Sequence, residues 1–140
     1  MKHVALQVTH PCRICSSDAT TTHVQSFSVG PLRYSAGTRC RACGYSLELD
    51  GPAPPEDVRA RLLEAHGRWS VRLAAAGPRH VEVVLLLCEM ARLEKRAAVK
   101  LSKTPNADVF VGTVVECAYW AAKLGAAGAA VDVVAALGVS

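Results

Sequence analysis

Long apolar stretches, aromatic residues and charged residues are all scarce in this 140-residue chain. No uninterrupted apolar stretch approaches the roughly 20 residues that a membrane-spanning helix needs, so we expect no membrane partner. The first residues lack the long apolar core of a signal peptide, and we therefore expect a cytoplasmic protein. Aromatic residues make up 5% and charged residues 20%, whereas hydrophobic residues make up 51%, which indicates a globular chain.

The net charge of +4 is distributed over wide stretches of the sequence. Residues 1–51 carry five Lys and Arg against three Asp and Glu, and residues 79–140 carry seven against six. Nucleic-acid-binding domains usually have a more concentrated excess, so nucleic acid is an allowed partner but not a required one. No nucleophile, acid–base pair or open metal can be assembled by spacing, and we expect neither an enzyme nor a small-molecule substrate.

Four of the six cysteines form two Cys-x-x-Cys pairs, Cys12 with Cys15 and Cys40 with Cys43. Each pair can fold as a knuckle that points two thiolates the same way, and two knuckles complete a tetrahedron that suits Zn²⁺. Gly44 follows the second pair and can adopt the positive φ that closes such a turn. Protein sulfurs then fill every position and exclude a catalytic water, so one structural zinc ion is expected.

Alternating segments flank the pairs and extend this prediction to the first 51 residues. Strands are predicted over 3–9, 22–29 and 32–38, and again where Tyr45, Leu47 and Leu49 alternate. Strand, knuckle, two strands, knuckle and strand is the plan of the zinc ribbon family. Residues 1–51 resemble that family over their whole length, including the 24-residue spacer between the pairs.

Other ligand chemistries are open from the sequence alone. One Cys-x-x-Cys is sufficient for a redox dithiol, and four thiolates also suit an iron site of rubredoxin type. His10 or His23 could replace a cysteine as a ligand. A ribbon of this size has too little core to fold alone. Zinc binding contributes roughly 10–16 kcal/mol in small zinc-finger peptides, which is enough to fold the ribbon, so the site is expected to be structural.

A proline-rich stretch at residues 52–55 marks the expected domain boundary. Glu56 and Asp57 then suit the first turn of a helix predicted over 55–66. The expected organisation is a zinc ribbon over 1–51, a linker with a connecting helix over 52–67, and a third segment over 68–140.

The third segment alternates strands and helices. Strands are predicted over 69–73, 109–111 and 130–134, and helices over 80–91, over 92–103, and from a capping box at Thr113 and Glu116 through Leu124. The predicted order is β-α-α-β-α-β. Together with the antiparallel ribbon, this order places the chain in the α+β fold class.

With this predicted order of strands and helices, residues 69–134 resemble the C-terminal domain of the bacterial ribosomal stalk protein of the large subunit. The matching residues are Val71, Leu73, Ala75-Ala76-Gly77, Leu93, Ala98, Leu101, Pro105, Gly112, Glu116, Ala118, Leu124, Ala127-Gly128-Ala129, Val131 and Val133. The resemblance covers about half of the chain and implies a ClpS-like fold, which the Clp protease adaptor that recruits substrates by their N-termini also has.

The chain departs from the stalk family at the positions that family uses for binding. The family presents lysines and an arginine on its first two helices to translation GTPases, beside a Gly-Leu-Gly connection. Here those positions hold Leu85, Cys88 and Val99, and the connection reads Arg92-Leu93-Glu94. No residues match the N-terminus pocket of the protease adaptor either. The resemblance therefore implies the fold without either binding activity.

The predicted helix over 80–91 is apolar on two sides. One stripe, with Val83 and Leu87, is expected to face a sheet, and a second stripe consists of Val81, Leu85 and Cys88. A second apolar stripe needs cover from the connecting helix or the ribbon, or from a second subunit or a partner protein. The second stripe is therefore a candidate interface.

Basic residues gather at two further places. Arg92, Arg96, Lys100 and Lys103 follow at helical spacing, and Arg39 and Arg41 lie beside the second cysteine pair. Each group is either a solvated face or a surface for an acidic protein or a phosphate backbone. The sequence as a whole predicts a non-catalytic zinc-binding adaptor or scaffold, ribosome-associated by resemblance. A nucleic-acid-binding ribbon (on ribosomal RNA or DNA) and a substrate-delivery adaptor are the alternatives.

Overall fold

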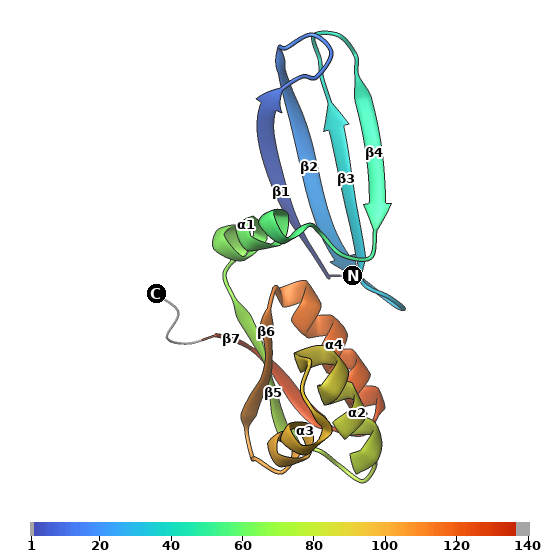
Figure 1. Cartoon of the computed structure of the whole chain (residues 1–140), viewed down its shortest axis with the longest axis vertical. Helices are drawn as coiled ribbons and strands as arrows, with labels where there is room; N and C mark the ends of the chain where they lie inside the picture. The colour runs from blue at the N-terminus through green and yellow to red at the C-terminus, as the bar shows by residue number, and fades with distance from the viewer. Residues whose placement is uncertain (1, 137–140) are drawn as a thin grey trace. The chain divides into compact units, whose positions relative to one another are not determined.

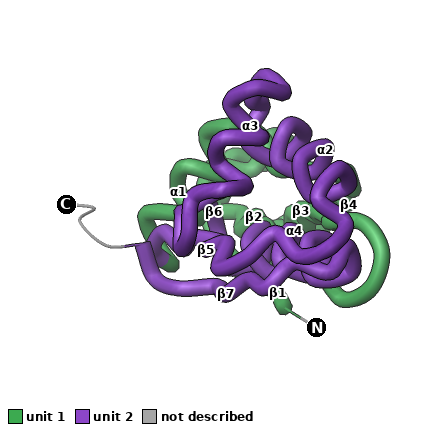
Figure 2. The backbone as a smooth tube through the Cα atoms, turned by 90° about the horizontal axis from the view of Figure 1, so that it is seen from below, with its two compact units in different colours: residues 1–66 green, residues 67–140 purple. Residues whose placement is uncertain are grey.

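The computed structural model describes residues 2–136, and these form seven strands and four helices (Figure 1). The chain divides into two compact units, residues 1–66 and residues 67–140, which Figure 2 colours separately. Residues 137–140, the end of the predicted third segment, lie outside the described residues. Among the residues described, no helix combines the length and the hydropathy that crossing a bilayer demands.

Unit 1 is a four-stranded antiparallel sheet in the order β1-β2-β3-β4, followed by one helix. The bounds are β1 Lys2–Pro11, β2 Asp18–Phe27, β3 Arg33–Arg39, β4 Ser46–Gly51 and α1 Glu56–His66. The predicted antiparallel plan is confirmed. The second strand begins earlier than predicted because residues 18–21 pair with residues 8–11 of β1. Val29, predicted to end that strand, lies in the following turn and is 90% exposed.

The helix α1 belongs to unit 1, where it packs on β1. It buries Val58, Leu62 and Leu63, and its His66 Nε2 lies 2.7 Å from the carbonyl oxygen of Ala5. On the sheet, the cross-strand row Val4, Gln25 and Tyr34 is buried as well. The two faces of this sheet therefore differ, because side chains of the opposite parity on the strands remain open to solvent.

Unit 2 is a three-stranded antiparallel sheet in the order β6-β5-β7, packed against three helices (Figure 1). The bounds are β5 Trp69–Ala75, α2 His80–Ala91, α3 Lys95–Ser102, β6 Ala107–Gly112, α4 Val114–Ala126 and β7 Ala130–Ala135. This is the predicted β-α-α-β-α-β order, and the α+β class is confirmed. The predicted capping box also forms, since Glu116 N donates to Thr113 Oγ1 and Thr113 N donates to Glu116 Oε1.

The core of unit 2 lies between its sheet and its helices. Fully or almost fully buried residues come from β5 (Val71, Leu73), α2 (Val83, Leu87) and α4 (Cys117, Leu124). On the opposite face of β5, Arg72 Nε donates to Asp108 Oδ1 at 3.1 Å. The first stripe of α2 is thus buried, as the sequence predicts.

The second helix of this unit is shorter than the predicted 92–103. Arg92 has φ 52 and ends α2, so it does not belong to α3, which begins at Lys95. Ala98 and Ser102 are the buried residues of α3, whereas Ala97 is exposed. The left-handed turn at Arg92 explains the difference, because it breaks the continuous helical spacing that the sequence suggests.

Candidate metal centre

The first cysteine pair forms a closed turn at the end of β1. Cys12 N donates to the carbonyl oxygen of Ser17 at 2.7 Å, and Ser16 N donates to that of Cys12 at 2.9 Å. Ile14 N donates to Cys12 Sγ at 3.4 Å. Ser16 has φ 65, in the left-handed region that glycine adopts more readily than other residues. This conformation changes the direction of the backbone and closes the turn.

The second pair repeats this turn at the end of β3. Cys40 N donates to the carbonyl oxygen of Tyr45, and Gly44 N donates to that of Cys40, both at 2.9 Å. Gly44 has φ 79 and occupies the position that Ser16 holds in the first turn. The role predicted for Gly44 is confirmed, and the matching role of Ser16 was missed because serine gives no sequence signal for positive φ.

The two turns bring all four sulfurs together. The Sγ atoms of Cys12, Cys15, Cys40 and Cys43 lie within 4.8 Å of one another. The shortest separations join opposite turns, at 3.7 Å for Cys12 and Cys43 and 3.5 Å for Cys15 and Cys40. Sulfurs at the corners of a tetrahedron with metal–sulfur distances of about 2.3 Å lie about 3.8 Å apart. The four cysteines are therefore positioned to bind one metal ion.

Hydrogen bonds and mutual proximity alter the acidity of these thiols in opposite directions. The backbone hydrogen bond from Ser17, followed by its side chain, lowers the pKa of Cys15 to about 6. The backbone N–H groups of Cys15 and Ile14 lower the pKa of Cys12. The backbone hydrogen bond from Tyr45 acts in the same sense at Cys43, but desolvation and the three neighbouring thiols raise the pKa of Cys43 to about 12. Four thiolates at this spacing therefore repel one another, and a bound cation would offset that repulsion.

Neither histidine that could have replaced a cysteine belongs to the cluster. His10 Nε2 lies 2.6 Å from Thr21 Oγ1, which in turn lies 2.8 Å from Thr38 Oγ1. His23 Nδ1 lies 2.7 Å from the hydroxyl of Tyr34. Both rings are bound to neighbouring strands of the sheet, and the metal-ligand set consists of sulfur alone.

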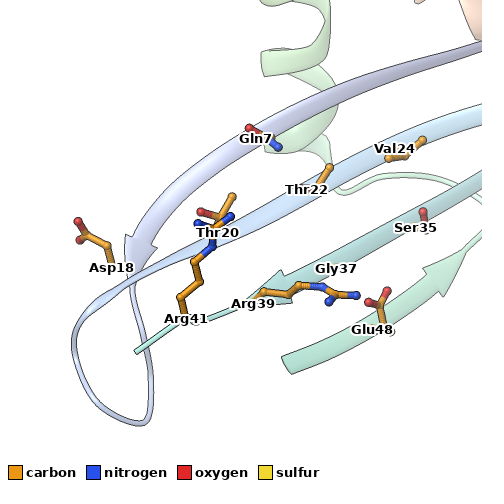
Figure 3. Close-up of a pocket in the computed structure, with 10 residues that line it drawn as sticks. All are labelled: Gln7, Asp18, Thr20, Thr22, Val24, Ser35, Gly37, Arg39, Arg41 and Glu48. Atoms are coloured by element: carbon orange, nitrogen blue, oxygen red, sulfur yellow. The ribbon is translucent and has the colours of Figure 1, made fainter. Parts of the chain in front are cut away.

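Arg39 and Arg41 extend over the open face of the same sheet. They border a hollow of about 570 Å³, which exists because most other side chains on this face are short (Figure 3). Its other lining residues are Gln7, Asp18, Thr20, Thr22, Val24, Ser35, Gly37 and Glu48. In Figure 3 the Arg39 guanidinium points toward the Glu48 carboxylate. Sequence reasoning missed this face, because Thr20, Thr21 and Thr22 on β2 show no alternation of polar and apolar residues.

The candidate interface on α2 is exposed only in part. Val81 is 68% and Leu85 is 56% exposed, whereas Cys88 is half-buried and packs against the core. Leu85 also borders a hollow of about 420 Å³ between α2 and α4, where the other lining residues are Glu82, Leu86, Glu89, Lys123, Ala126 and Ala127. Of the predicted stripe, Val81 and Leu85 are thus the residues available to a partner.

No family model, curated protein or solved structure matches this chain. Its function is therefore inferred from its own residues, namely the cysteine cluster and the exposed side chains of the two units. The similarity of residues 69–134 to the ribosomal stalk domain stays a sequence-based prediction.

Proposed function

We propose that this protein is a non-catalytic zinc-binding adaptor of the bacterial cytoplasm, which holds a partner protein against unit 2. In this proposal the ion is one Zn²⁺, and its role is to fix the fold of unit 1. Zinc suits the site because it accepts four thiolates and has no preferred geometry of its own. Four protein sulfurs leave no coordination position for a reacting water, which supports a structural ion.

The observation that carries the adaptor proposal is the exposed stripe on α2. Val81 and Leu85 are large apolar side chains on one side of a helix whose opposite side is already buried in the core. Within unit 2, no segment of the described chain covers them. Exposed apolar side chains beside a hollow mark protein contact surfaces more often than scattered single ones do.

The resemblance to the stalk domain selects the partners to test first. A ribosome-associated protein is the first class, because the resembling domain works on the ribosome. A substrate delivered to a protease is the alternative, and it depends on the fold analogy alone. Self-association through α2 is a third arrangement that the same experiment detects.

Replacing Leu85 with Glu will abolish capture of the partner. The full chain, tagged and incubated with nuclease-treated extract of its source cells, is expected to enrich one protein reproducibly. Leu85→Glu places a carboxylate in the apolar contact, and we expect the captured amount to fall by at least about tenfold. Mass spectrometry of the captured proteins measures the effect, and light scattering after gel filtration reports any change in self-association.

Val29→Glu is the matched control, because Val29 is an exposed valine in a turn of the other unit. This variant is expected to capture the same protein as the original chain. The adaptor proposal is wrong if Leu85→Glu, shown to be folded by circular dichroism, leaves both the captured proteins and the molecular mass unchanged.

A nucleic-acid-binding ribbon is the second candidate, and the hollow on the open face of unit 1 favours it. Arg39, Arg41 and the hydroxyl groups of Thr20, Thr22 and Ser35 are side chains of the kinds that contact phosphates. Asp18 and Glu48 border the same hollow, and their carboxylates would repel a polyanion. This candidate requires that Arg39→Glu with Arg41→Glu abolish salt-dependent binding of RNA or duplex DNA. Retention of binding in that variant excludes it.

A further inference from the structure

The segment 92–103 accounts for the whole net charge of the chain. Five of its residues are basic (Arg92, Lys95, Arg96, Lys100 and Lys103), and Glu94 is its single acidic residue. Its net charge is +4, which equals that of the entire protein and leaves eleven basic and eleven acidic residues elsewhere. The positive charge is therefore concentrated at one place, α3 and its two ends.

The fold turns these cations toward solvent. Ala98 and Ser102 are the buried residues of α3, and all five basic residues are exposed. Arg92 lies just before the helix in its left-handed conformation, and Lys103 is the C-cap. The segment thus presents its five basic side chains to solvent, and we call this group the α3 basic surface.

These charges have no ionic partner in the part of the chain that the structure describes. Within residues 2–136, none of the five side chains forms a salt bridge. Elsewhere in the same unit, Arg72 pairs with Asp108 and Arg79 pairs with Glu82. The α3 basic surface is therefore free to meet an anion from outside the chain.

Helix stability does not explain where the cations lie. Lys100 and Lys103 lie near the C-terminal end of α3, where the helix dipole favours positive charge. Lys95 and Arg96 occupy its first two positions, where the same dipole disfavours positive charge, and the first turn contains no acidic residue. Two of the five cations therefore gain nothing from the helix dipole, although the N-cap Glu94 stands beside them, and helix stability alone does not account for their positions.

The surroundings of the surface favour phosphates over an acidic protein. Protein interfaces are anchored on buried apolar or aromatic side chains and are depleted of lysine at their centres. Among the described residues of unit 2, the exposed large apolar side chains are Val81, Leu85 and Val111, and none of them belongs to the segment 92–103. The segment has no aromatic residue on which a base could stack. Lys and Arg without apolar anchors are the usual contacts to a nucleic-acid backbone.

We propose that the α3 basic surface binds the phosphate backbone of a nucleic acid without reading its sequence. The surface consists of other residues than the α2 stripe on which the adaptor proposal depends, although α3 packs against α2. Either proposal can therefore fail without the other. It also differs from the arginine pair of unit 1, so the two nucleic-acid surfaces can be distinguished by substitution.

The test measures binding of a fluorescein-labelled single-stranded oligonucleotide of about 20 nucleotides, by fluorescence anisotropy at several salt concentrations. The full chain is expected to bind in a strongly salt-dependent manner. Arg96→Gln with Lys100→Gln is expected to weaken binding at least about tenfold and to lower the slope of log K against log salt by about 1.4, since two phosphate contacts are removed. A duplex of the same sequence is expected to lose affinity in the same variant.

Two control variants test the assignment to α3. Arg96→Lys with Lys100→Arg conserves the charge and is expected to retain binding. Arg39→Gln with Arg41→Gln removes the same charge from unit 1 and is expected to retain it as well. Equal losses in both Gln pairs would show a response to overall charge and overturn the proposal.

Two further results would also overturn it. One is the absence of oligonucleotide binding by the original chain at low salt. The other is tighter binding of poly-glutamate than of the oligonucleotide with the same loss in Arg96→Gln with Lys100→Gln, which would assign the surface to an acidic protein.

Discussion

Removing the metal from the four-cysteine cluster will unfold unit 1 and leave unit 2 folded. The knuckle end of unit 1 has almost no core of its own: Cys12, Ala19 and Cys40 are its buried residues, with Tyr45 packed against them. Without the ion, these sulfurs contribute no bonds between the two turns. Zinc sites in small peptides contribute roughly 10–16 kcal/mol, which exceeds what so small a core can supply.

The tryptophans make this result measurable, because both Trp69 and Trp120 lie in unit 2. Adding a zinc chelator is expected to remove the amide resonances of unit 1 from a folded NMR spectrum while tryptophan fluorescence stays unchanged. The core of unit 2 draws only on residues 69–133, so it does not need the ion. Metal analysis of the untreated protein is expected to give one zinc per chain.

Cys12→Ser should reproduce the effect of the chelator, and Cys88→Ser is its matched control. Cys88 is a half-buried cysteine outside the cluster, so its replacement is expected to leave the metal content unchanged. Folded unit 1 without stoichiometric metal would contradict the structural role. A water bound to the ion in a crystal structure would contradict the saturated four-sulfur site.

The cysteine cluster could be predicted from the sequence because its information is local. Two Cys-x-x-Cys pairs limit the ligands to four, and each turn is closed by hydrogen bonds between residues at most five apart. The positive φ of Ser16 was not predicted, because it follows from the closure of the turn and not from the conformational preference of serine. The open face of the sheet escaped for a different reason. Its threonines carry no apolar alternation, so the start of β2 at Asp18 follows only from the pairing of this strand with β1.

In unit 2, the elements with strong end signals were predicted closely. The helix over 80–91 ends at the predicted residue, and Thr113 with Glu116 marks the start of α4. The helix over 92–103 was predicted too long, because the spacing of apolar and basic residues does not show that Arg92 adopts a left-handed conformation. Because of the same boundary error, the basic residues were assigned to one face of a single long helix. Charges counted over residues 79–140 did not reveal that the net charge resides in 92–103, because the acidic residues of α2 lie in the same range and offset the basic ones.

Gly77→Ala will destabilise unit 2 strongly, because Gly77 lies where two turns of the unit touch. A Cβ at this position would come 2.2 Å from the carbonyl oxygen of Gly128, which belongs to the turn between α4 and β7. Gly77 also has φ +78, a conformation that costs other residues roughly 1–2 kcal/mol. Arg79 ties the same two turns by donating from Nη2 to the carbonyl oxygen of Ala126 at 2.7 Å, which restricts how far they can separate.

Strain and overpacking together predict a loss of about 2–5 kcal/mol in the free energy of unfolding of unit 2, a large part of the stability of a small domain. Urea unfolding followed by tryptophan fluorescence measures it, since both tryptophans report on this unit alone. Gly125→Ala is the matched control: Gly125 lies inside α4, and a Cβ there would meet nothing within 4 Å. This control should gain about 0.5–1 kcal/mol from the better helix propensity of alanine. Equal effects of the two substitutions would mean that the turns do not meet at Gly77.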